Sequence, residues 1–243
     1  MIKKFLLLIF LSSSISASNI PSNESTTGTA LTLRHFHTFS SIFKSLTEVN
    51  IEKENELTTK KEFQFGIRAR IHNNIKLSSY FKRAYGQRHL DDWTVENSNW
   101  HWKDSSDRGE NILGVGVSLR ELFDVNILEF RTTLERNFES SQSTLKLRPG
   151  ITHIFLRKGS PFINFFLQYE VYFPINFHEE TVYKSGIYTG ALYHWKKNIK
   201  PGFFVKITRT KWTNSQTAIS RNVPTYLSTD SKTIFGFNIN LYY

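Results

Sequence analysis

The chain contains no cysteine among its 243 residues. This absence excludes disulfide bonds, thiolate metal sites and catalysis by a thiol. It also leaves no cysteine to which a lipid anchor could be attached. Any activity must therefore come from other side chains.

Long apolar runs are missing as well. After residue 18 no stretch reaches the roughly 18 apolar residues of a transmembrane-helix candidate. Hydrophobic residues make up 39% of the chain, below the roughly 45–50% of soluble domains, yet aromatic residues reach 15%. This combination is typical of a membrane β-barrel, in which every second residue faces lipid and the others face a polar lumen.

Residues 1–18 have the pattern of a cleaved secretory signal peptide. Lys3 and Lys4 precede a short apolar core, and small residues lead to an expected cleavage site after Ala17 or Ser18. Its removal takes two of the 31 basic residues, which leaves 29 against 21 acidic residues and a formal charge of +8. We expect a flexible leader at 19–30, followed by one barrel domain at 31–243.

Alternation with a period of two predicts the strands. In 62–71, for example, Phe63, Phe65 and Ile67 alternate with Gln64 and Arg68. Ten segments are expected to form an all-β, single antiparallel transmembrane barrel: 31–39, 62–71, 75–85, 111–120, 126–138, 144–156, 161–173, 183–195, 201–210 and 232–243. The segment 44–52 is an alternative first strand, and twelve is the alternative strand count.

The connections between these segments alternate in length. They span about 22, 25, 5, 9 and 21 residues after odd-numbered strands and about 3, 5, 4 and 5 after even-numbered ones. A barrel with long external loops and short periplasmic turns requires this alternation. Within 144–156, Pro149-Gly150 predicts a β-bulge, because proline cannot donate to the ladder.

The C-terminal segment resembles the assembly signal of bacterial outer-membrane proteins. Its alternating set is Phe235, Phe237, Ile239, Leu241 and Tyr243, and it ends on tyrosine where many such proteins end on phenylalanine. This resemblance implies recognition by the barrel-assembly machinery in a bacterial outer membrane. More weakly, 129–193 is similar to small barrel families known only as domains of unknown function, which imply no activity.

The inward-facing positions of the expected strands carry many charges. The candidate lumen and selectivity residues are Arg68, Arg70, Lys76, Lys82, Arg131, Lys146, Arg148, Lys206, Glu62, Glu129, Glu135 and Glu170. Eight of these are basic and four acidic, and such an excess favours anions in a low-dielectric wall. The alternative is a filled lumen in which these charges only pair with one another.

Three tryptophans mark the loop after 75–85. Trp93, Trp100 and Trp102 are expected to cover the barrel mouth as a plug or to bind a ligand, glycan or partner. His35 and His37 share a strand face, but no carboxylate lies near them in sequence, so we expect no metal site.

The sequence favours a passive pore for small solutes with a weak anion preference. The alternatives are a non-catalytic surface barrel that binds through loops 86–110 and 211–231, and a hydrolase built on loop histidines at 89, 101 and 178. No nucleophile motif accompanies these histidines, so we expect no enzyme and no cofactor. Expected partners are membrane lipid and lipopolysaccharide, the assembly machinery and small anionic solutes, but not nucleic acid.

Overall fold

The fold consists of strands joined by turns. The computed structural model describes residues 24–54, 58–86, 93–96, 99–102, 108–177, 182–213 and 227–243. Within these ranges no helix is long and apolar enough to cross a membrane. The expected signal peptide and the first part of the expected leader, residues 1–23, lie outside the described residues.

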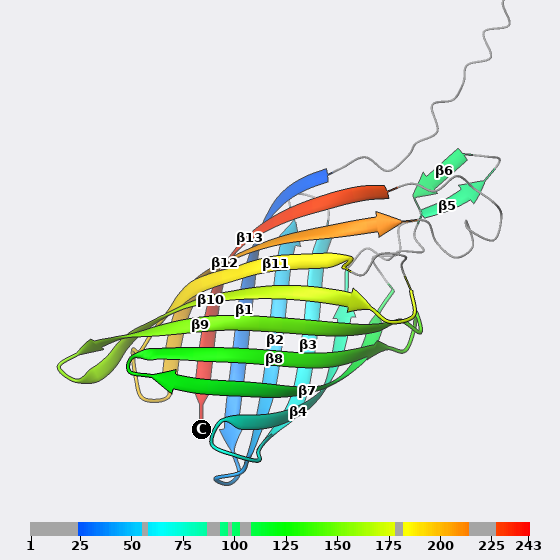
Figure 1. Ribbon diagram of the computed structural model, residues 1–243. Helices are drawn as coiled ribbons and strands as arrows, with labels where there is room; N and C mark the ends of the chain where they lie inside the picture. Colours follow the sequence, from blue (N-terminus) through cyan, green and yellow to red (C-terminus); the bar gives the residue numbers. More distant parts are fainter. Residues whose placement is uncertain are drawn as a thin grey trace, which may run out of the picture.

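Eleven strands close into a single barrel (Figure 1). Their order around the barrel is β1-β13-β12-β11-β10-β9-β8-β7-β4-β3-β2. The strands are β1 (Glu24–Thr38), β2 (Phe43–Glu54), β3 (Thr58–Arg70), β4 (Ile75–Tyr85), β7 (Glu110–Phe123), β8 (Asn126–Asn137), β9 (Ser143–Arg157), β10 (Ser160–Pro174), β11 (Lys184–Tyr193), β12 (Ile199–Thr213) and β13 (Leu227–Tyr242). A separate hairpin, β5 (Trp93–Glu96) with β6 (Asn99–Trp102), follows β4.

The all-β, single-barrel architecture is as expected, but the strand count is eleven and not ten or twelve. Both 31–39 and its alternative 44–52 form strands, as parts of β1 and β2. β1 begins at Glu24, so the second half of the expected leader belongs to the barrel wall. The connection of about 22 residues expected before 62–71 is therefore mostly the strand β2.

The barrel closes through one parallel pairing. β1 pairs with β13 in parallel, from Glu24 opposite Asp230 to Phe36 opposite Tyr242. Every other barrel pairing is antiparallel, including that of β1 with β2. The odd strand count and the parallel pairing are linked, because an antiparallel meander of odd length brings its first and last strands together running the same way.

All long connections lie at one end of the barrel. At that end, the long-loop end, the connections cover 55–57, 86–109, 138–142, 175–183 and 214–226. At the opposite end, the short-turn end, they cover 39–42, 71–74, 124–125, 158–159 and 194–198. The chain enters β1 at the long-loop end and leaves β13 at the short-turn end.

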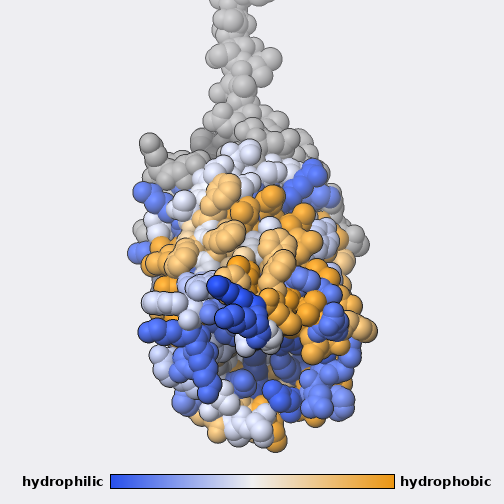
Figure 2. Space-filling model, turned by 90° about the vertical axis from the view of Figure 1, so that its left-hand side faces the viewer, coloured by the Kyte–Doolittle hydropathy of each residue, from blue (hydrophilic) through white to orange (hydrophobic). Residues whose placement is uncertain are grey.

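The two faces of the wall differ in polarity. Large apolar side chains point outward at every second position and are about half exposed, as in Phe63 (46%), Phe65 (45%) and Ile67 (49%). Figure 2 shows such side chains gathered over the upper part of the face in view, with hydrophilic ones below them. Phe235, Phe237 and Tyr243 of the expected assembly signal belong to this outward set. An apolar exterior around a polar lumen is the pattern of a barrel surrounded by lipid.

The bulge expected at Pro149-Gly150 is absent. Phe130 faces Pro149 and the β8–β9 register continues unshifted. On the β10 side the ladder has a gap between the pairs of Gly150 and Leu147, but the register is the same on both sides of it. The missing N–H of proline interrupts the ladder without adding a residue, and the irregularity of this hairpin lies at Pro161–Ile163 instead.

Candidate functional site: the barrel lumen

A cavity of about 700 Å³ runs along the inside of the barrel. Trp212 and Asp230 line it near the long-loop end, and Arg120 and Tyr242 line it near the short-turn end. The side chains of one continuous cavity therefore come from both ends of the wall.

Most of the candidate selectivity residues line this cavity. They are Arg68, Lys76, Lys82, Arg131, Lys146, Arg148, Lys206, Glu62, Glu129, Glu135 and Glu170. Arg70 does not: it is the last residue of β3, is exposed and lies outside the lining.

The residues expected to line the lumen did not include the charged side chains of β1 and β2, nor several charged side chains of other strands. The additional charged residues of the lining are Arg34, Glu48, Glu52, Glu54, Lys60, Glu110, Arg120, Lys184, Lys211, Asp230 and Lys232. The alternation Glu48-x-Asn50-x-Glu52-x-Glu54 opposite Val49 and Ile51 was the signal that could have identified β2 as wall. With these residues included, the described lining holds thirteen basic and nine acidic side chains.

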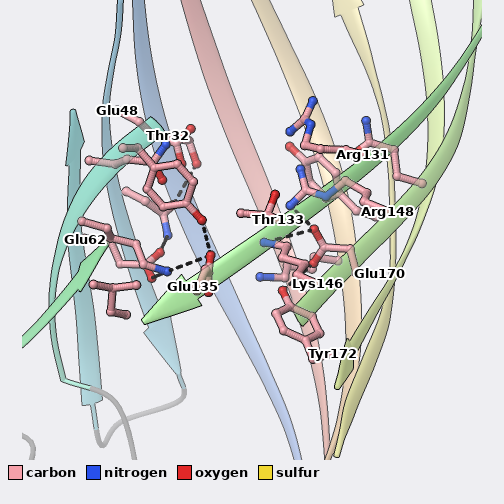
Figure 3. A pocket seen from close by; sticks show the side chains of 18 of the residues that line it. Thr32, Glu48, Glu62, Arg131, Thr133, Glu135, Lys146, Arg148, Glu170 and Tyr172 are labelled. Atoms are coloured by element: carbon pink, nitrogen blue, oxygen red, sulfur yellow. Dashed lines mark hydrogen bonds and ion pairs between the residues drawn. The ribbon is translucent and has the colours of Figure 1, made fainter. Parts of the chain in front are cut away.

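Glu170 is the centre of one polar cluster in the lumen (Figure 3). Its side chain is 4% exposed and pairs with Arg148, with Lys146 at 3.8 Å, and with the Tyr172 hydroxyl, which donates to it at 2.8 Å. Arg148 and Lys146 lie on β9, while Glu170 and Tyr172 lie on β10. One carboxylate in this cluster thus serves two cations and one hydroxyl donor.

A second cluster, on β3, β4 and β8, lies next to the first around the barrel wall (Figure 3). Lys82 lies 4.0 Å from both Glu62 and Glu135, and the Tyr80 hydroxyl donates to Glu135. Lys60 pairs with Glu62 at 3.1 Å. Nearer the closing seam, Lys232 of β13 pairs with Glu52 and Glu54 of β2 across the width of β1.

Two glycines allow aromatic rings to lie flat on the inner wall. A Cβ at Gly114 would overlap the ring of Tyr80, and one at Gly236 would overlap the ring of Phe204. Each ring therefore occupies the surface of a neighbouring strand and not the axis of the barrel. Phe204 also forms a small apolar cluster in the lumen with Phe166 and Ile234.

Positive and negative charges are distributed unevenly along the barrel. Seven of the nine lining carboxylates lie within five residues of their strand's end at the long-loop end: Glu52, Glu54, Glu62, Glu110, Glu135, Glu170 and Asp230. Glu48 and Glu129 lie further toward the other end, and each pairs with an arginine, Arg34 at 2.6 Å and Arg131 at 2.9 Å. The excess of basic charge is thus concentrated toward the short-turn end.

His194, in the turn after β11, adds no charge at this end. Partial burial, aided by the positive charge of Lys200, lowers the pKa of the imidazole from its ordinary value of 6.5. It is therefore neutral at pH 7. Its backbone N–H donates to the carbonyl of Phe162 at 2.9 Å, which anchors the turn.

Only some of the loop residues expected to cover the barrel mouth or to form a hydrolase site belong to the described residues. Trp93 and Trp102 are paired partners across the β5–β6 hairpin, and Trp100 also lies in β6. His101 lies in the same strand, whereas residues 89 and 178 of the hydrolase hypothesis fall outside the described residues.

His35 and His37 lie on the outer face of β1 near the short-turn end. Their rings are 6.3 Å apart, and His35 lies 5.3 Å from the ring of Tyr243. Within the described ranges no group of three or more histidine and carboxylate side chains is arranged to hold a metal.

No protein-family model matches the chain, and a search of curated proteins finds no similar sequence. What the protein does must be inferred from its own geometry.

Proposed function

We propose that this protein is a passive pore of a bacterial outer membrane that passes small solutes and prefers anions. The observation that carries the proposal is the continuous cavity lined from Trp212 at one end to Arg120 at the other. An apolar exterior supports insertion into lipid, and a polar lumen supports a path for water and ions.

The anion preference follows from the charges along this path. Thirteen basic side chains face nine acidic ones in the described lining. In a narrow passage with low-dielectric walls, an excess of one sign raises the local concentration of the opposite ion. Ion pairing leaves this excess unchanged, because each pair takes up one charge of each sign.

The test is single-channel recording of the refolded protein in a planar bilayer under a potassium chloride gradient. We expect discrete current steps and a reversal potential displaced toward the chloride equilibrium potential. Silence from protein that has inserted in its folded form would contradict the pore.

A matched pair of variants tests the origin of the selectivity. Lys206→Gln removes a lumenal cation that has no carboxylate of the described residues within 4.0 Å, and should lower the anion-to-cation permeability ratio by about twofold. Lys158→Gln, in the exposed turn after β9, removes the same charge outside the lumen and should leave the ratio unchanged.

A second candidate function is binding through the loops of the long-loop end. The β5–β6 hairpin favours it, because this hairpin places Trp93 opposite Trp102 in a loop that the closed barrel does not need. Trp100→Ala with Trp102→Ala distinguishes a plug from a binding surface: removal of a plug raises conductance, whereas removal of a binding surface does not.

A further inference from the structure

Three cations near the short-turn end form a cluster of their own. Arg68 of β3, Lys76 of β4 and Arg120 of β7 line the cavity on three strands that are neighbours in the wall. Each lies within four residues of its strand's end at the short-turn end. We call these three residues the basic cluster.

The strand register brings these side chains together. Arg68 stands opposite Ser78 and Lys76 opposite Ser118, so each pair of consecutive cations is related by a two-residue diagonal. Diagonal neighbours on one face of an antiparallel pair lie roughly 7–8 Å apart and are within reach of long side chains. Three long cationic side chains can therefore converge on one ligand.

The basic cluster is not neutralised by the protein. No carboxylate of the described residues lies within 4.0 Å of any of its three charges. The nearest candidate is Glu129, the cross-strand partner of Arg120, but its carboxylate accepts hydrogen bonds from Arg131 and Ser118 instead.

The other lumenal arginines show the contrast. Arg34, Arg131 and Arg148 each have a carboxylate in contact. Lys184 and Lys206 also lack one within 4.0 Å, but they lie closer to the long-loop end, where seven carboxylates gather. Among the described residues of the lining, only the basic cluster has three cations on neighbouring strands with no carboxylate within 4.0 Å.

We propose that the basic cluster is a binding site for a doubly charged oxyanion of the phosphate class, carried by a small solute that enters the lumen. A guanidinium group presents donors in a planar fork that matches two oxygens of a tetrahedral anion. Two such forks and one ammonium compensate a divalent phosphate better than they compensate a single chloride. The Arg68 guanidinium also lies over the ring of Phe36, 5.7 Å from its centroid, which limits the directions in which it can turn.

This inference deepens the proposed pore, since it names the solute class that the pore selects. It is tested by a measurement that needs no current: equilibrium dialysis of the refolded protein in detergent against radiolabelled inorganic phosphate. A second dialysis uses glycerol phosphate, so that the two arms distinguish free phosphate from a phosphate monoester by which one binds more tightly.

The test variant is Arg68→Gln/Lys76→Gln/Arg120→Gln. The matched control is Arg70→Gln/Lys158→Gln/Lys197→Gln, which removes the same charge from exposed positions of the short-turn end outside the cavity lining. We expect at least a tenfold loss of affinity for the better-bound probe in the test variant and less than a threefold change in the control. Folding of both variants is checked by the shift of the barrel band in unheated gel electrophoresis. If a triple variant does not fold, its three single substitutions are measured instead.

The outcomes separate the two proposals. Binding of neither probe, or binding that is equal in the wild type and the test variant, overturns the site. A protein that binds phosphate through the basic cluster but passes no current keeps the site and removes the pore. A protein that conducts but binds no phosphate keeps the pore and removes the site.

Discussion

At the scale of the residue, the lumen depends on carboxylates that each hold several donors. Glu170 is buried and is held by Arg148, Lys146 and the Tyr172 hydroxyl. A buried carboxylate is stable only while such partners compensate the loss of water. Arg148 and Lys146 depend on Glu170 in turn, because its negative charge compensates them for their own loss of water.

Glu170→Gln should therefore lower the free energy of unfolding by about 2 kcal/mol, since it leaves two lumenal cations without their counter-charge. Urea titration of the refolded protein in detergent, followed by tryptophan fluorescence, measures this change. Glu121→Gln is the control, because Glu121 bonds Asn74 at an exposed position of the short-turn end and should change stability by less than about 0.5 kcal/mol. Equal effects of the two substitutions would contradict the role of the cluster.

At the scale of the element, β1 is the unusual strand. It stands between β2 and β13, which run antiparallel to each other, so a barrel without β1 could close as ten antiparallel strands. The parallel seam between β1 and β13 extends over thirteen residue pairs. Parallel pairing is slightly less stable per residue than antiparallel pairing, so this seam is weaker per residue pair than the other pairings of the barrel.

Cross-linking tests the seam directly, because the chain has no cysteine of its own. Leu33 and Ile239 are paired partners, so Leu33→Cys with Ile239→Cys should form a disulfide under mild oxidation. Leu33→Cys with Phe235→Cys should not, since Phe235 lies four residues away along β13, at roughly 13 Å. A cross-link in the second pair and not in the first would show that the register is different.

At the scale of the whole molecule, eleven strands place the two ends of the barrel chain at opposite rims. Glu24 begins β1 at the long-loop end, and β13 ends with Tyr242 at the short-turn end. Ten strands would have returned both ends to the same side of a membrane. If the long loops face outward, as their length leads us to expect, the beginning of the barrel is exposed at the cell surface.

Surface labelling of intact cells checks this orientation. Ser141→Cys lies at the long-loop end and Lys158→Cys at the short-turn end, and both replace residues with a positive φ in a turn, 56° and 53°. We expect a membrane-impermeant maleimide to label Ser141→Cys in intact cells and Lys158→Cys only after the outer membrane is opened. The opposite labelling pattern would show that the barrel has the reverse orientation in the membrane.

The local alternation of the chain was sufficient to predict the class of fold, ten of the eleven barrel strands and half of the lumenal charges. Phe63, Phe65 and Ile67 predict their strand clearly, because lipid-facing and lumen-facing positions alternate in polarity from one residue to the next. β1 was harder to place because threonine and histidine occupy much of its outward face, and β2 because Ser45 and Thr47 interrupt its outward face. Where neither face is clearly apolar, alternation is too weak to mark a strand.

Only the tertiary structure decided how the barrel closes and which charges meet. The contact of Lys232 with Glu54 joins residues 178 positions apart in the chain, and the contacts of Lys232 with Glu52 and Glu54 exist because β1 brings β13 and β2 to either side of itself. In the same way, the inward charges were readable from the sequence, but the pairing of Arg148 and the isolation of Arg68 were not. Polarity at each position is a property of the local pattern, whereas charge pairing depends on register and curvature, which arise only when the sheet closes on itself.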